Sequence, residues 1–218
     1  EVWQDAHVYD TGMVTIIEIM GRHAGWLAAS ASLASLTGCG PDLLYLPEVD
    51  FDMDQFIADV TSIYNKTGKC LVAVSEGIHY ADGRFVSEAE TSATDGIELS
   101  LLQRCGAHLA SHVDVEEAKM AGRVAVEAAV AGNTDKMVAF KCTRDGGKYT
   151  CETVLEPLDI VANFEKKVPR EWINAAGNGV EQAFIDYALP LIQGEPERPK
   201  ESALPRFARL KKVLTTDM

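Results

Sequence analysis

VTIIEIM, residues 14–20, runs directly into GRHAG, residues 21–25. The first stretch is rich in β-branched residues and nearly continuous in apolar character, which is typical of a strand buried on both faces of a parallel sheet. The glycines of the second stretch predict a tight turn. Residues 26–36 consist largely of Ala, Leu and Ser and predict a helix that ends near Gly38. Together the three stretches indicate a unit of strand, loop and helix.

A second unit of the same kind follows along the chain. Residues 43–46 predict a short strand, and residues 52–64 predict an amphipathic helix that stops before Gly68. Residues 70–74 and residues 97–102 predict two further buried strands. This alternation predicts an α/β fold with right-handed crossovers, in which ligands bind beyond the carboxyl ends of the strands.

The second half of the chain has a different pattern. Residues 114–131 predict a long helix with Asp114 as its N-cap and acidic residues in its first turn. Residues 136–142 and 148–154 predict two strands joined by a hairpin turn at residues 145–147. The Pro-rich, charged residues 195–200 predict a surface loop or tail.

Composition limits the kind of ligand. The 218 residues are 47% hydrophobic and 24% charged, as in a globular protein that buries a real core. Lys and Arg number 20 against 33 Asp and Glu, a formal charge of -13, which argues against binding to nucleic acid. We expect any anion to be bound by a few focused groups.

The cysteines and the chain start bear on location and extent. Five widely spaced cysteines without a CxxC pair predict reduced, mostly buried thiols in a cytoplasmic protein. No apolar run approaches the roughly 20 residues that span a bilayer, so we expect no membrane partner. The chain opens at Glu1 without Met or a signal segment, and we therefore expect it to be a fragment.

The loop GRHAG is a candidate anion site. Glycines between a strand and a helix leave backbone N–H groups facing one point, and the Arg22 guanidinium suits a phosphate. On spacing alone, a tight turn with an exposed Arg22 is an equal alternative. His23 in the same loop is a candidate general base by its ordinary pKa, but a structural role is the better interpretation of a lone loop histidine.

Other candidates lie at predicted strand ends. Glu76 follows the strand at residues 70–74, where a carboxylate can accept hydrogen bonds from sugar hydroxyls, and a structural loop carboxylate is an equal alternative. Gln103 and Arg104 follow the strand predicted at residues 97–102, and Arg104 is again a phosphate-type group. His108 and His112 have the spacing of metal ligands on one helix face, but no third ligand supports a metal site there.

Four motifs in order resemble the phosphofructokinase family. They are IIEIMGRHAGWLA at residues 16–28, PDLLYLPEVDF at residues 41–51, VAVSEGI at residues 72–78 and LLQR at residues 101–104. The tail from NFEKKVPREWIN at residue 163 onward is similar to the longer bacterial members, which often use pyrophosphate. The resemblance implies a three-layer α/β/α fold with a mostly parallel sheet, and a chain that lacks the N-terminal donor-binding half.

The resemblance also implies roles for particular residues. It places Met20, Gly21 and Arg22 around fructose 6-phosphate, with Arg22 close to the reacting phosphoryl group. It gives Glu76 the sugar and Arg104 the 6-phosphate. Two further positions of the LLQR segment, Leu101 and Gln103, complete the substrate site, although the family has His or Tyr where this chain has Leu101.

Some features of the family are missing. Two arginines that reach the substrate across a subunit interface fall at Met13 and Asp95, neither of which can serve. The family also has a long segment where Asp95 runs directly into Gly96, so we expect tens of residues to be absent there. The aspartate that acts as catalytic base belongs to the donor-binding half, and the chain therefore contains no base.

The function implied is transfer of a phosphoryl group from pyrophosphate or ATP to fructose 6-phosphate, with Mg²⁺, by a homo-oligomer that is a dimer or tetramer. Two alternatives stay open. One is a non-catalytic sugar-phosphate-binding regulatory subunit, because of Met13 and Leu101. The other is a dinucleotide-binding dehydrogenase domain, although no GxGxxG follows a strand.

The resemblance divides the chain into three parts. Residues 1–102 form part of the fructose 6-phosphate-binding domain, residues 103–154 pack back on the donor domain, and residues 155–218 form a C-terminal helical extension.

Overall fold

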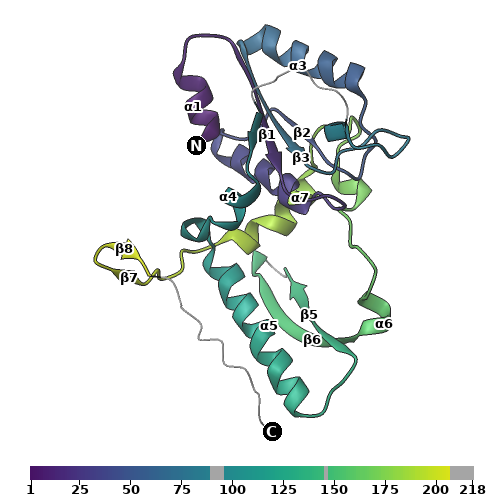
Figure 1. The fold of residues 1–218 in the computed structure, drawn as a ribbon, viewed down its shortest axis with the longest axis vertical. Helices are drawn as coiled ribbons and strands as arrows, with labels where there is room; N and C mark the ends of the chain where they lie inside the picture. Colours follow the sequence, from purple (N-terminus) through teal and green to yellow (C-terminus); the bar gives the residue numbers. More distant parts are fainter. Residues whose placement is uncertain (89–95, 145–146, 207–218) are drawn as a thin grey trace.

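The computed structural model describes residues 1–88, 96–144 and 147–206. Its centre is a parallel sheet of four strands in the order β2, β3, β1, β4. Figure 1 labels β1, β2 and β3 of this sheet. The strands are β1 (Met13–Ile19), β2 (Leu43–Tyr45), β3 (Lys69–Ser75) and β4 (Gly96–Glu98). The predicted α/β class and the parallel sheet are therefore confirmed, and the first three strands lie within one or two residues of their predicted bounds.

Helices cover both faces of this sheet. The α-helix α3 (Met53–Thr67) packs on one face, against side chains of β2 and β3 such as Val72. The α-helices α2 (Trp26–Ser30) and α7 (Gln182–Ala188) pack on the other face. The fold thus has the three layers that were expected.

Two predicted helices differ in detail from the observed ones. The helix predicted at residues 26–36 is divided into α2 and the 3-10 helix η1 (Ala31–Thr37), which ends at Gly38 in the left-handed conformation. The helix predicted at residues 52–64 instead begins at Met53 and continues to Thr67 as α3. Asp52 is its N-cap, because its side chain accepts a hydrogen bond of 2.9 Å from the Gln55 N–H.

The strand predicted at residues 97–102 is wrong beyond Glu98. β4 has three residues, and the chain then turns at Leu99 into the α-helix α4 (Ser100–Arg104). The reason is that a short apolar run fits a buried strand and a buried helix equally well. Gln103 and Arg104 consequently lie on a helix and not at a strand end.

A second body contains α5 (His112–Val130), β5 (Lys136–Thr143) and β6 (Thr150–Pro157), and β5 and β6 form the predicted antiparallel hairpin (Figure 1). The N-cap of α5 is Ser111, whose hydroxyl accepts a hydrogen bond of 3.2 Å from the Asp114 N–H. Asp114 is therefore a first-turn residue and not the cap.

His108 and His112 do not share a helix face. His108 lies in the 3-10 helix η3 (Ala107–Leu109), and extended residues separate this helix from His112 at the start of α5. The metal-like spacing of the two histidines has no structural counterpart.

The C-terminal part is less helical than expected. It contains α6 (Leu158–Val161), η5 (Arg170–Trp172), α7 and η6 (Leu189–Ile192), followed by the hairpin of β7 (Lys200–Glu201) and β8 (Leu204–Pro205). This segment also supplies core residues for the α2 face of the sheet, namely Val168, Ile173, Phe184 and Ala188. Residues 168–188 therefore complete the sheet domain, while the division of the whole protein into three parts stays a prediction.

The remaining elements are α1 (Val2–Val8) and η2 (Val86–Glu88). The interruption predicted between Asp95 and Gly96 involves residues 89–95, which lie outside the described residues. Within the described residues, no helix is both long and apolar enough to span a membrane.

The cysteines are all unbridged, but only Cys70 is buried. Burial raises the pKa of its thiol to about 11. Cys105 is exposed, and the other three are half-buried. The expectation of mostly buried thiols was therefore wrong.

Candidate functional site

The carboxyl ends of β1 and β3 lie side by side. Ile19 is the register partner of Ser75, and the Glu76 N–H continues the ladder with a hydrogen bond of 2.9 Å to the Ile19 carbonyl. The two loops that follow, residues 20–25 and residues 76–77, are therefore neighbours at one edge of the sheet, as the expected position of ligand sites in α/β folds requires.

Gly21 is held from both sides by the end of β3. Its N–H donates to Glu76 Oε1 at 3.3 Å, and its carbonyl accepts a hydrogen bond from the Ser75 hydroxyl. The φ of Gly21 is +144°, and a Cβ there would lie 2.7 Å from the Ala24 carbonyl oxygen. Only glycine fits this conformation without strain.

The two loops also touch at Gly77. A Cβ on Gly77 would lie 1.8 Å from the carbonyl oxygen of Arg22, so the two backbones are in direct contact. The Arg22 side chain itself is exposed, and its guanidinium carbon lies 5.9 Å from the centre of the Phe85 ring. The loops thus fix the backbone of Arg22 and leave its charged group accessible.

The helix α4 brings another predicted site residue, Gln103, to the loop at residues 20–25. The Met20 N–H donates a hydrogen bond of 3.1 Å to Gln103 Oε1, across 83 residues of sequence. The structure therefore brings together Met20, Gly21, Glu76 and Gln103.

Three predicted residues are placed less closely. Arg104 is the last residue of α4 and is exposed. Leu101 lies in the same helix, α4, three residues before Arg104 in the sequence. His23 is exposed, and the described residues provide it with no hydrogen bond, so the expected structural role is not observed.

Three acidic side chains influence one another near the carboxyl end of β1. Burial raises the pKa of Glu18, and the negative charges of Glu98 and Glu76 raise it further. Glu18 and Glu98 are register partners on β1 and β4. Sequence reasoning missed both residues, although a glutamate within the buried strand VTIIEIM was a detectable signal.

Glu48 holds the far end of the GRHAG loop. Its Oε1 accepts hydrogen bonds from the Gly25 N–H at 2.9 Å and from the Val168 N–H at 3.0 Å. The Trp26 indole N–H donates to the Lys166 carbonyl at 2.7 Å. The glutamate of the PEVDF motif therefore links this loop to the C-terminal segment, a role that the sequence did not reveal.

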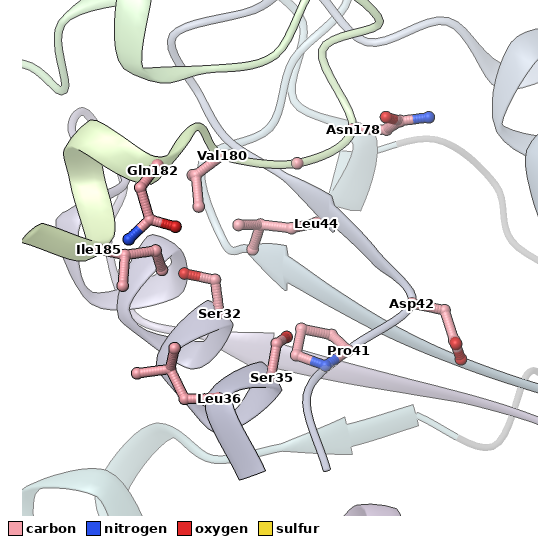
Figure 2. A pocket seen from close by; sticks show the side chains of 11 residues that line it. Ser32, Ser35, Leu36, Pro41, Asp42, Leu44, Asn178, Val180, Gln182 and Ile185 are labelled. Carbon is pink, nitrogen blue, oxygen red and sulfur yellow. The ribbon is translucent and has the colours of Figure 1, made fainter. Parts of the chain in front are cut away.

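A cavity of about 300 Å³ lies elsewhere, between η1, the start of β2 and the residues that lead into α7 (Figure 2). It opens near the amino end of β2, away from Gly21 and Glu76. Asp42 Oδ2 accepts a hydrogen bond of 2.8 Å from the Leu71 N–H, and Asn178 donates one of 2.8 Å to Asp59. Because these polar groups at its rim are engaged within the protein, we do not assign the site to this cavity.

Comparison with known proteins identifies the family. The model of the phosphofructokinase family matches residues 2–129, and the chain belongs to this family. The dehydrogenase alternative is thereby excluded.

Relatives share the fold and the sequence. The chain is 38% identical to the pyrophosphate–fructose 6-phosphate 1-phosphotransferase of Halomonas elongata, over 91% of this chain and 54% of that protein. It is 37% identical to the enzyme of the same name from Methylococcus capsulatus, over 90% and 53%. The crystal structure of a pyrophosphate-dependent phosphofructokinase from Nitrosospira multiformis matches with a TM-score of 0.83 and 35% identity, over 97% and 55%. The chain spans about half the length of the curated relatives it matches.

Proposed function

We propose that the chain is the fructose 6-phosphate-binding half of a 6-phosphofructokinase, with pyrophosphate favoured over ATP as the phosphoryl donor. The observation that carries this proposal is the junction at which Glu76 and Gln103 bind the backbone of Gly21 and Met20. These are four of the substrate-site positions expected from the family. The names of the relatives above favour pyrophosphate.

In this proposal Arg22 is the catalytic residue of the chain. Its exposed guanidinium lies beside the transferring phosphoryl group and offsets the charge that develops in the transition state. Met20, Gly21, Glu76 and Gln103 position the sugar. Glu76 Oε1 is occupied by the Gly21 N–H, which leaves the second carboxylate oxygen to accept a sugar hydroxyl.

The remaining substrate residues are Arg104 and Leu101. Arg104 is exposed, as a group that meets the non-reacting 6-phosphate must be. Leu101 replaces a polar family residue, and its position in α4 lies within the same segment as Gln103.

The aspartate base and the donor site belong to the half of the protein that this chain lacks. The second body supports this division, because several of its large apolar side chains are exposed. They include Val126, Val130, Met137 and Phe140, with exposed fractions of 64%, 85%, 42% and 46%. An apolar surface of this kind fits residues 103–154 packing on a donor-binding domain.

Mg²⁺ would be supplied with the donor. Among the described residues, no group of three or more His, Cys, Asp or Glu side chains is arranged to hold a metal ion. In phosphoryl-transfer sites Mg²⁺ is commonly bound by the phosphates of the substrate, by water and by only one or two carboxylates. We therefore assign no residue of this chain to the ion.

We further propose that the complete enzyme is a cytoplasmic homo-oligomer. A second candidate function is a non-catalytic regulatory subunit, which is favoured by Met13 and Leu101 at positions where the family has polar contacts.

The test is an assay of the full-length protein with fructose 6-phosphate and either pyrophosphate or ATP, in which fructose 1,6-bisphosphate is measured directly. We expect turnover with pyrophosphate and little with ATP. Binding of fructose 6-phosphate without turnover on either donor would favour the regulatory subunit, and absence of binding would contradict both candidates.

A further inference from the structure

The Ser75 side chain is completely buried at the end of β3, with a relative exposure of 0%. A buried hydroxyl needs a hydrogen-bond partner, because an unpaired one is costly. Its partner is the carbonyl of Gly21, which belongs to the peptide between Gly21 and Arg22. Ser75 therefore bonds directly to the backbone that precedes the catalytic arginine of the proposed reaction.

This bond determines the direction of the peptide. In a trans peptide the C=O and the following N–H point in opposite directions. Because the Gly21 carbonyl points inward to Ser75, the Arg22 N–H must point away from the interior, toward the accessible side of the loop. The exposed Arg22 side chain is attached to the Cα that follows this N–H.

The other contacts of this loop do not by themselves fix the orientation of the peptide between Gly21 and Arg22. The φ of +144° at Gly21 is accessible because glycine has no Cβ, so glycine alone would also permit a flipped peptide. Glu76 binds the preceding N–H, and Gly77 touches the carbonyl of Arg22, but neither contact holds the Gly21 carbonyl itself. The Ser75 hydroxyl is the group that selects one orientation.

We propose that Ser75 is a positioning residue that locks the peptide between Gly21 and Arg22 and thereby aims the guanidinium of Arg22 at the phosphoryl group. This inference rests on the proposed function. It predicts an effect mainly on turnover, since misdirected groups lose most of their value in the transition state.

The experiment uses the full-length protein with pyrophosphate and fructose 6-phosphate. Ser75→Ala is expected to lower kcat about 10-fold with less than a threefold change in KM. Ser75→Thr retains the hydroxyl and is expected to restore most of kcat. Thr15→Val is the matched control, because it removes another buried hydroxyl from the same sheet, away from the loops.

A double-mutant cycle separates positioning from general stabilisation. If Ser75 acts through Arg22, Ser75→Ala should have little further effect on kcat in an Arg22→Ala background. Full additivity of the two substitutions, or wild-type kcat in Ser75→Ala, would overturn the inference. If Ser75→Ala does not fold, Ser75→Cys, which has a weaker donor of similar size, takes its place in the same cycle.

Failure of the proposed function gives a different result. In that case the unmodified protein itself would form no fructose 1,6-bisphosphate, whereas failure of the Ser75 inference alone leaves an active wild type and an unaffected variant.

Discussion

The Glu76 carboxylate accepts the Gly21 N–H at 3.3 Å, which connects two loops that are 55 residues apart in the sequence. The bond uses one carboxylate oxygen and orients the other. Glu76 therefore serves two purposes in the proposed enzyme, because it fixes the loop before Arg22 and presents an acceptor to the sugar.

We predict that Glu76→Gln raises the KM for fructose 6-phosphate about 10-fold, with a smaller effect on kcat. The amide keeps an oxygen for Gly21 but weakens the bonds that a charged acceptor makes to sugar hydroxyls. Steady-state kinetics of the full-length protein measure both constants. Glu88→Gln, an exposed change on η2, is the control. A fall in kcat alone would show that Glu76 does not bind the sugar.

The first half of the fold could be predicted because its signals are local. The strand at β1, the glycines of the GRHAG loop and the helix α3 are each determined by neighbouring residues. The motifs of the family then placed Met20, Gly21, Glu76 and Gln103 in one site, and the structure brings these four together.

The errors arose where tertiary contacts decide the outcome. The run at residues 97–102 becomes a strand only as far as Glu98, where pairing with Glu18 of β1 ends. Likewise, Ser75 and Glu48 act on backbone groups of distant loops. A single sequence does not show which carbonyl or N–H a buried side chain will reach.

We predict that Arg22→Ala lowers kcat on the order of 10²- to 10³-fold, because a guanidinium beside the transferring phosphoryl group acts most strongly in the transition state. The measurement is single-turnover and steady-state kinetics of the full-length protein. Arg84→Ala is a matched control, since Arg84 is exposed and pairs with Asp82 at 2.7 Å on the surface. Normal turnover of Arg22→Ala would make Arg22 a structural residue.

We predict that Arg104→Ala raises the KM for fructose 6-phosphate and leaves kcat within about threefold of wild type. The residue is proposed to bind the non-reacting phosphate, so its contact is the same in the ground state and the transition state. The effect should shrink with a substrate analogue that lacks the 6-phosphate. Arg84→Ala, an exposed arginine that pairs with Asp82 on the surface, is again the control. An unchanged KM with reduced kcat would contradict this role.

The last prediction concerns Glu18 and pH. Burial and the charges of Glu98 and Glu76 raise its pKa in the folded protein above the value in the unfolded chain. The folded state therefore binds this proton more tightly, so the contribution of Glu18 to stability is complete below the unfolded pKa and is lost as pH rises through the folded pKa. Ionisation of the Glu18 side chain therefore costs stability.

It follows that Glu18→Gln should raise the midpoint of thermal unfolding by a few degrees at pH 7, and that the difference should shrink as the pH falls toward 4, because the raised pKa favours the protonated side chain in the folded wild type. Thermal unfolding of the full-length protein across this range, with hydrogen exchange of β1 and β4 as the local readout, measures the effect. Glu116→Gln is a control of opposite sign, because hydrogen bonding to Lys119 lowers the pKa of Glu116 and its contribution is lost on acidification. A stabilisation by Glu18→Gln that persisted unchanged at pH 4 would show that ionisation of the buried Glu18 is not its cause.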